Sequence, residues 1–226
     1  GDVILVVDVG GGTTDLSLIA VTDHDGELGL TRLAVGDHIL LGGDNMDLAL
    51  AHTVAQRLAA DGRKRDAWQF NALTFACREA KEGLFAQPDL VSAPLAIPGR
   101  GSSLIGGTIR AELKREELER VLTEGFFPRT AIGELPQTAR RSGLAQMALP
   151  YAQDAAVTRH LAAFLTRQAT ALADAHDVPP GIVRGSFVHP PAILFNGGVF
   201  KAAPLERRVR EVVDGWLAAD GGTPTR

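Results

Sequence analysis

Short runs of consecutive apolar residues alternate with glycine-containing turns at the start of the chain. Residues 3–7 read Val-Ile-Leu-Val-Val and are typical of a buried strand. Two similar runs follow at 16–22 and 28–35, with Asp23-His24-Asp25-Gly26 as a hairpin turn between them. This pattern predicts three strands in a β-meander, whose first connection, residues 8–15, contains consecutive glycines.

Apolar side chains then recur at helical spacing in three longer segments. Residues 44–60, 67–85 and 154–175 each carry an apolar stripe and predict amphipathic helices. Asp44 is expected to cap the first of these helices. A last helix should begin near Pro204, because proline is well accepted in the first turn of a helix.

The stretch between the second and third helices differs in composition: Pro, Gly and Ser separate short predicted elements. We expect strands at 90–97 and 104–109, and an exposed helix at 114–125. An irregular excursion should follow over 126–150. After the third helix, a proline-rich connection leads into a buried strand predicted at 192–195.

The order of these elements predicts an α/β fold, with an α+β subdomain inserted into a layered core. Residues 1–60 and 154–219 would form the core, and residues 61–153 the inserted subdomain. Residues 220–226 remain as a tail, which we expect to be disordered. The sequence begins at Gly1 without a methionine and enters a strand at Val3, so we expect it to be a piece of a longer protein.

Composition narrows the class of protein. The net charge of −4 and scattered basic residues give no indication of nucleic-acid binding. No apolar run reaches the roughly 18 residues needed to span a bilayer. The single cysteine, Cys77, excludes an internal disulfide and is expected to be a buried thiol, and the histidines lack metal-ligand spacing. We therefore expect a cytoplasmic protein without nucleic-acid or membrane partners.

The first turn, residues 8–15, is the strongest chemical signal. Its glycines allow the backbone to approach a phosphate closely, with N–H groups turned inward. Asp8 and Asp15, at the two ends of the turn, could hold a hydrated Mg²⁺ and orient a water molecule beside phosphates. On the residues alone, a glycine-rich hairpin with a solvated aspartate at each end is an equal alternative.

Two further glycine turns are weaker signals. Gly42-Gly43-Asp44 precedes a predicted helix, and Asn196-Gly197-Gly198 lies between a predicted strand and a helix. A glycine pair lets a flat ligand such as a nucleoside approach the backbone, but strand–Gly-Gly–helix connections are common without any ligand. The co-occurrence and the order of the three turns are what favour a nucleotide site.

Five segments, in the same order, resemble the DnaK-type (seventy-kilodalton heat-shock) chaperones. DVGGGTTDLS at 8–17 is similar to the second phosphate motif of the actin–hexokinase–chaperone ATPase superfamily. Residues 36–47 resemble the family's Gly-Asp turn and Leu-Gly-Gly signature, and ILFNGGVFKAAPL at 193–205 resembles its adenosine motif. Residues 75–84 and 113–119 resemble the adenosine-facing helix and a helix start of the outer subdomain.

The resemblance implies the second lobe of an actin-like ATPase domain, with a ribonuclease-H-like motif of a mixed sheet and flanking helices. Its inner and outer subdomains would bind ATP or ADP with Mg²⁺. The residues implied at the phosphates are Gly10, Gly11, Gly12 and Thr13. Those implied in catalysis are Asp8, Thr13 and Asp15, with Asp8 and Asp15 holding Mg²⁺ through water. Those implied at the adenosine are Gly43, Lys81, Gly197 and Gly198.

The sequence departs from the family on the adenosine side. Arg78, Glu82 and Phe85 stand where the family has an acid, an adenine-stacking arginine and a small hydroxyl residue. Val199-Phe200-Lys201 replaces Ser-Thr-Arg. Loss of the arginine removes a cationic surface from the adenine. Phe85 or Phe200 could stack on the base instead, although core packing is the commoner role of each.

Three functions stay open. The first is a DnaK-like molecular chaperone whose ATPase drives a partner domain, and the second is a non-hydrolysing scaffold. The third is another ATPase of the superfamily, such as a filament-forming protein. The first lobe and a peptide-binding domain are not recognisable, so this piece alone should not hydrolyse ATP. The missing lobe and unfolded client proteins are the expected partners, and the insertion between Phe126 and Tyr151 resembles a divergent bacterial branch.

Overall fold

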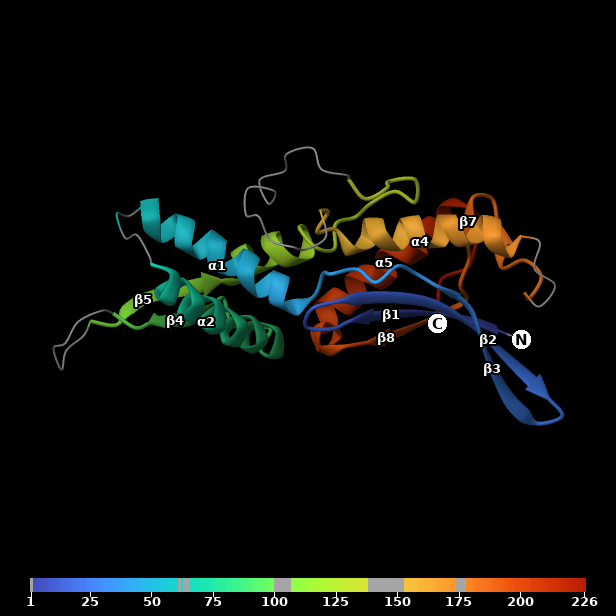
Figure 1. The fold of residues 1–226 in the computed structure, drawn as a ribbon, viewed down its shortest axis with the longest axis horizontal. Helices are drawn as coiled ribbons and strands as arrows, with labels where there is room; N and C mark the ends of the chain where they lie inside the picture. Colours follow the sequence, from blue (N-terminus) through green and yellow to red (C-terminus); the bar gives the residue numbers. More distant parts are fainter. Residues whose placement is uncertain (1, 61, 63–65, 100–106, 138–152, 174–177) are drawn as a thin grey trace. The chain divides into compact units, whose positions relative to one another are not determined.

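The computed structural model describes residues 2–60, 62, 66–99, 107–137, 153–173 and 178–226 (Figure 1). These residues fold into two compact units. The first combines Gly1–Gly43 with Phe126–Arg226, and the second is Asp44–Gly125. The predicted inserted subdomain covered 61–153, whereas the second compact unit begins with the first helix.

The first unit contains a four-stranded mixed sheet in the order β3-β2-β1-β8. The strands are β1 (Asp2–Val9), β2 (Thr14–His24), β3 (Glu27–Val35) and β8 (Ala192–Asn196). β1, β2 and β3 are antiparallel neighbours, and β8 runs parallel to β1. The predicted meander and the strand predicted at 192–195 are therefore confirmed. That strand was expected to be buried, but only Ile193 of β8 is buried and Leu194 is exposed, because β8 lies at the edge of the sheet.

Alternation along β1 decides which face of the sheet is buried. Val3, Leu5, Val7 and Val9 are all 0% exposed, and the residues between them are half-buried or exposed. In Figure 1 the helices α4 (Val157–Leu172) and α5 (Ala203–Ala219) lie over one side of the sheet. Their buried apolar stripes complete this core, as helical periodicity requires. Both helices were predicted, including the proline in the first turn of α5.

The last residues are ordered against the sheet, so the prediction of a disordered tail is wrong. The N–H of Arg226 donates to the carbonyl of Pro191 at 3.0 Å, and its carbonyl accepts from Ile193 at 3.2 Å. This is parallel pairing with the edge of β8 that does not face β1, where the backbone groups of an edge strand need partners. The guanidinium of Arg226 also lies 2.7 Å from the carboxylate of Asp2, which joins the two ends of the chain.

A short hairpin that the sequence did not predict follows α4. It consists of β6 (Val183–Arg184) and β7 (Phe187–Val188), and β7 packs against α4. Phe187 and Val188 are buried, which anchors the hairpin to the core. Strands of two residues are too short to show a hydrophobic period, which explains why the pattern missed them.

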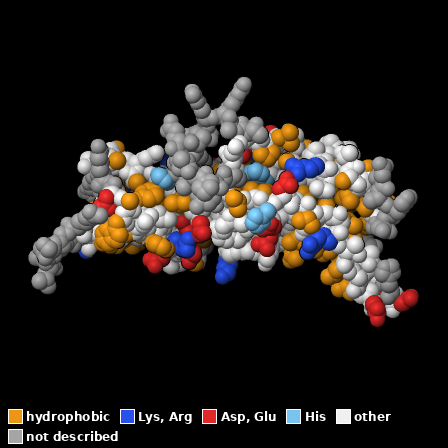
Figure 2. Space-filling view, viewed as in Figure 1, with side chains coloured by type: hydrophobic (Ala, Val, Ile, Leu, Met, Phe, Trp, Pro, Cys, Tyr) orange, Lys and Arg blue, Asp and Glu red, His pale blue; other side chains and the backbone are white. Residues whose placement is uncertain are grey.

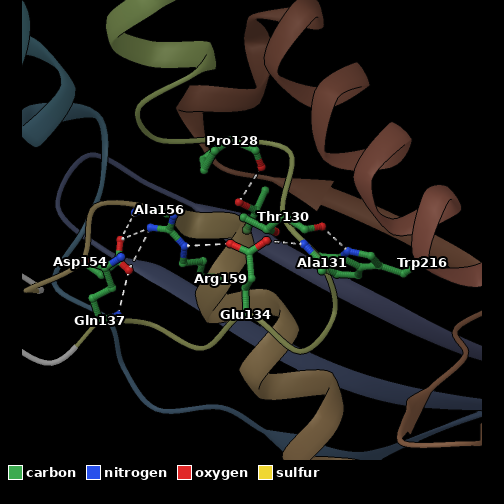
Figure 3. A network of polar contacts seen from close by, with 10 residues as sticks. Pro128, Thr130, Ala131, Glu134, Gln137, Asp154, Ala156, Arg159 and Trp216 are labelled. Carbon is green, nitrogen blue, oxygen red and sulfur yellow. Dashed lines mark hydrogen bonds and ion pairs between the residues drawn. The ribbon is translucent and has the colours of Figure 1, made fainter.

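The excursion that begins at Phe126 is tied to α4 and α5 by polar contacts (Figure 3). The indole N–H of Trp216 donates to the carbonyl of Thr130 at 2.6 Å, and Thr158 donates to the carbonyl of Pro128 at 2.9 Å. Residues 126–137 contain no helix or strand, as expected; the rest of the predicted excursion, residues 138–150, lies outside the described residues.

Asp154 is the centre of this polar network. Its carboxylate accepts from the backbone N–H groups of Gln137 and Ala156, both at 2.9 Å, and pairs with Arg159 at 3.2 Å. Burial by itself would raise the pKa of Asp154, but these hydrogen bonds and the charge of Arg159 lower it below its usual value. The network therefore requires an ionised carboxylate.

The second unit pairs two helices with a β-hairpin. Its helices are α1 (Gly43–Ala60) and α2 (Ala67–Ala86), both predicted. The strands β4 (Ser92–Ile97) and β5 (Ile109–Lys114) are antiparallel, and β4 packs against α2. A short α3 (Arg115–Leu118) continues into the π-helix η1 (Glu119–Thr123).

Two details of the second unit correct the predictions. The strand expected at 104–109 falls largely on residues outside the described part, and β5 lies further on, ending at Lys114, where the expected helix 114–125 begins. Cross-strand pairing from Ser92 to Ile97 selects this register. Asp44 does not cap α1, because the helix already begins at Gly43 and the carboxylate of Asp44 pairs with Arg78.

Candidate functional site

The connection between β1 and β2 is a tight loop, residues 10–13. The N–H of Gly10 donates to the carbonyl oxygen of Thr13 at 2.9 Å, which closes the loop. Gly11 and Gly12 are exposed. Within the part of the chain that the structure describes, the N–H groups of Gly11, Gly12 and Thr13 have no hydrogen-bond acceptor. These donors are available to an anion or to water.

A second glycine turn lies directly against this loop. The N–H of Gly43 donates to the carbonyl oxygen of Gly10 at 3.0 Å. A Cβ atom at Gly42 would lie 2.6 Å from the carbonyl oxygens of both Gly10 and Gly11, closer than a Cβ can approach. Glycine at position 42 is therefore what allows the two turns to touch.

Thr14 holds the segment that carries this second turn. Its side chain is fully buried, and its hydroxyl donates to the carbonyl of Leu41 at 2.8 Å. Its backbone N–H and carbonyl pair with Ile39 at 2.9 and 3.2 Å. Gly36 adds a further bond to the carbonyl of Leu16. These hydrogen bonds hold residues 36–42 beside the first residues of β2.

The third glycine turn approaches the end of β1. Gly197 has φ +90°, a conformation that favours glycine, and a Cβ there would lie 2.2 Å from the carbonyl oxygen of Val9. The same Cβ would be 2.8 Å from Oδ1 of Asp8. The three turns that the sequence singled out therefore converge at the carboxyl end of β1.

A row of four polar side chains crosses the sheet beside these turns. Asp8 is the register partner of Asp15 on β2 and of Asn196 on β8, so the three lie on one face. The amide Nδ2 of Asn196 donates to Oδ2 of Asp8 at 2.8 Å. At the other end of the row, Nδ1 of His38 lies 2.7 Å from Oδ1 of Asp15. Val7 and Val9 fill the opposite face, so the row lies on the face that α4 and α5 do not cover.

The donor set at this row fits a hydrated magnesium ion. Two like charges directly across a strand pair repel each other, and a cation between them would relieve that repulsion. Asp15 is half-exposed, so water can reach its carboxylate. Among the described residues, no three His, Cys, Asp or Glu side chains gather closely enough to hold a metal directly. Binding through water, which Mg²⁺ favours, suits two carboxylates.

In the second unit, the basic residues Lys81 and Arg78 are both paired with one buried carboxylate, that of Asp47. Nζ of Lys81 lies 2.6 Å from Oδ1 of Asp47, and Nε of Arg78 lies 2.7 Å from Oδ2 of the same carboxylate. Asp47 is 1% exposed, and its hydrogen bond and charge raise the pKa of Arg78. Both cations are therefore paired with Asp47 of α1, within the second unit, whereas the glycine turns belong to the first unit.

Cys77 and Phe200 are core residues. The Cys77 thiol is buried, as predicted. Burial, reinforced by the charges of Asp47 and Glu117, raises the pKa of this thiol to about 12, so it is neutral. The Phe200 ring, in the 3₁₀-helix η3 (Gly198–Lys201), packs against Phe195 with centroids 4.9 Å apart. Phe200 is therefore not available to stack on a base.

Sequence reasoning missed His38 and Asn196 as partners of the two carboxylates. Asn196 was noted only as the first residue of a turn, and His38 was considered only among the histidines that lack metal-ligand spacing. A polar residue at the end of a predicted strand was the available signal for Asn196. His38 reaches Asp15 only because Thr14 pins its segment, and nothing in the local pattern shows that pairing.

The surface drawn in Figure 2 mixes lysine and arginine side chains with acidic and apolar ones. None of the helices in the described ranges has the length and apolar character that crossing a membrane would require.

A comparison of the sequence with protein-family models gives a match that includes most of the candidate site. A sequence model described as "Hsp70 protein" matches residues 1–134, more than half of the 226 residues. The matched range includes the loop at residues 10–13, the turn at Gly42-Gly43 and the whole second unit. The chain belongs to the Hsp70 family.

Proposed function

We propose that this chain is the ATP- or ADP-binding second lobe of a DnaK-like chaperone ATPase from a divergent bacterial branch. Membership of the Hsp70 family supports a chaperone ATPase. The observation that carries the finer proposal is the convergence of three glycine turns on Asp8, with backbone so close that no side chain fits at Gly42 or Gly197. An actin-like lobe with inner and outer subdomains is the fold that we assign to it.

The β1–β2 loop would hold the β- and γ-phosphates. The N–H groups of Gly11, Gly12 and Thr13 are donors without partners among the described residues, and the Thr13 hydroxyl adds a neutral donor. Gly10 has a structural part, because its N–H and carbonyl close the loop and bind Gly43. Gly43, Gly197 and Gly198 would leave room for the nucleoside.

Asp8 and Asp15 would hold the metal-bound waters. Mg²⁺, when bound, would neutralise charge on the phosphate oxygens and keep its water shell ordered. In this lobe, Asp15 would accept a hydrogen bond from the attacking water, while His38 fixes the orientation of that carboxylate. Phosphoryl transfer depends on positioning from both sides, so hydrolysis would need the first lobe of the parent protein.

A non-hydrolysing scaffold is the second candidate, and one observation favours it. Lys81 and Arg78 are bound to the buried Asp47, so neither cation is free to meet a sugar or an adenine without breaking an ion pair. Glu82 replaces the family's cation nearby. A protein that kept the fold as a docking surface would tolerate these changes.

Calorimetric titration of the full-length protein with Mg-ADP and Mg-ATP separates the two candidates. We expect saturable binding that Asp15→Ala weakens at least about tenfold, since removing a charged hydrogen-bonding group at a phosphate site costs 1.5–3 kcal/mol or so. Asp89→Ala, which removes an exposed carboxylate from the second unit, is the matched control and should bind normally. Absence of binding at millimolar nucleotide would support the scaffold instead.

A further inference from the structure

We infer that Asn196 is a positioning residue for Asp8: it holds one carboxylate oxygen so that the other is presented to the hydration shell of the nucleotide's divalent cation. This inference rests on the proposed nucleotide function and deepens it. It assigns a role to a side chain that the three glycine turns by themselves do not require.

The geometry defines which atoms take part. Nδ2 of Asn196 lies 2.8 Å from Oδ2 of Asp8. An ionised carboxylate only accepts hydrogen bonds, so the amide nitrogen rather than the amide oxygen must face it. Asn196 and Asp8 are register partners on neighbouring parallel strands, and the backbone ladder fixes their separation. The contact is therefore built into the sheet.

The second oxygen of Asp8 is left open by Gly197. A Cβ at Gly197 would lie 2.8 Å from Oδ1, so the missing side chain is what keeps this oxygen accessible. Two consecutive residues of one turn thus act on different oxygens of Asp8. Asn196 donates a hydrogen bond to Oδ2, and Gly197, which has no side chain, leaves space beside Oδ1. Because the terminal torsion of an aspartate is soft, a single strong donor is enough to select one orientation.

The two carboxylates of the row, Asp8 and Asp15, each have a hydrogen-bond partner at one oxygen. Asp15 has His38 at its Oδ1, at 2.7 Å, and Asp8 has Asn196 at its Oδ2. An amide and an imidazole flank the carboxylates from outside the pair, so each aspartate keeps one oxygen for water. This arrangement differs from direct coordination, and it suits a cation that keeps its waters.

The hydrogen bond itself contributes little to folding, which makes the inference testable. Asn196 is exposed at the end of β8, so water can replace its amide without burying an unsatisfied group. Asn196→Leu removes the donor with little change in volume. Leu194→Asn is the matched control: it lies two residues away on the same face of β8, and Leu194 is 53% exposed.

The experiment measures the dissociation constant of ADP by calorimetry twice for each full-length variant, in excess Mg²⁺ and in EDTA. The ratio of the two constants reports how much the cation contributes. We expect Asn196→Leu to reduce this ratio roughly fivefold to tenfold, which is less than the full value of a hydrogen bond to a charged group because Asn196 acts only through Asp8. The ADP affinity in EDTA should be unchanged. Leu194→Asn should keep the wild-type ratio, and both variants should keep the wild-type thermal midpoint.

Each other outcome overturns the inference in a distinct way. An unchanged ratio in Asn196→Leu would show that Asp8 needs no positioning, while the proposed function would stand. Equal losses of affinity in Mg²⁺ and in EDTA would show that Asn196 only shapes the turn. If wild-type protein binds no ADP under either condition, the proposed function fails and the role of Asn196 fails with it.

Discussion

At the scale of single residues, the site depends on side chains that are absent as much as on those present. Gly42 and Gly197 occupy positions where a Cβ would overlap backbone oxygens of the first loop and of β1. The polar residues beside them, Asp8 and Asp15, are held by one partner each. The absence of a side chain at these two glycines is what allows the three turns to approach one another closely.

Gly197→Ala tests this close approach. The new Cβ would lie 2.2 Å from the carbonyl of Val9, and position 197 has φ +90°. Strain of this kind should lower the free energy of unfolding by about 1–3 kcal/mol, measured by urea denaturation. Nucleotide binding should weaken as well, because the turn must move away from Asp8.

Gly215→Ala is the control for that substitution. Gly215 lies inside α5, and nothing lies within 4 Å of a Cβ built there. Alanine at this position should raise the free energy of unfolding by up to about 1 kcal/mol, because it is the better helix former. Equal stability of the two variants would contradict the steric account of Gly197.

At the scale of elements, local pattern was a good guide where the elements are long. The longer elements were all predicted from their apolar patterns: β1, β2, β3, α1, α2, α4 and α5. β3 was found from its apolar residues and turn although it is largely exposed, with Leu28 and Leu30 open to solvent. The hairpin β6–β7 and the register of β5 were not predicted. Two-residue strands have no period, and β5 is selected by its pairing with β4 rather than by its own residues.

The network that fastens the 126–137 segment to α4 should make stability depend on pH. The pKa of Asp154 is lowered in the folded protein, so its contribution is present above the ordinary carboxyl range. That contribution is lost as pH falls through the folded pKa. Asp154→Asn should therefore reduce the free energy of unfolding by about 1–3 kcal/mol at pH 7. The difference from wild type should shrink under acidic conditions.

Urea denaturation of both proteins between neutral and acidic pH checks this expectation. Asp37→Asn is a suitable control, because the side chain of Asp37 is 79% exposed and its ion pair with Arg167 is on the surface, where such pairs contribute little. Parallel pH profiles for wild type and Asp154→Asn would rule out an ionised Asp154 as the centre of the network.

At the scale of the whole molecule, the chain consists of two compact units and belongs to the Hsp70 family. The three glycine turns of the candidate site all come from the first unit, although Asp8 and Asn196 beside them are separated by 188 residues along the chain. Parallel pairing of β8 with β1 brings the last turn to the first. The predicted adenosine residue Lys81 belongs to the second unit.

We expect this chain by itself to show no ATP hydrolysis above a buffer blank, because it supplies donors and carboxylates for only one side of the phosphates. Release of inorganic phosphate from ATP, followed over hours, is the measurement. The full-length protein should hydrolyse ATP, and Asp8→Ala in that protein should reduce the rate at least about a hundredfold. Measurable turnover by the 226-residue chain alone would contradict the half-site proposal.

The sequence by itself determined the α/β class, the long helices and strands, and the three glycine turns whose order led to the Hsp70 family. These features are local, because hydrophobic period and turn chemistry act over a few residues. Only the tertiary structure decided that the turns meet at Asp8, that Asn196 and His38 hold the two carboxylates, and that Asp47 engages Lys81. It also decided that the tail pairs with β8. Each of these depends on strand register or on distant backbone, which no local window of sequence encodes.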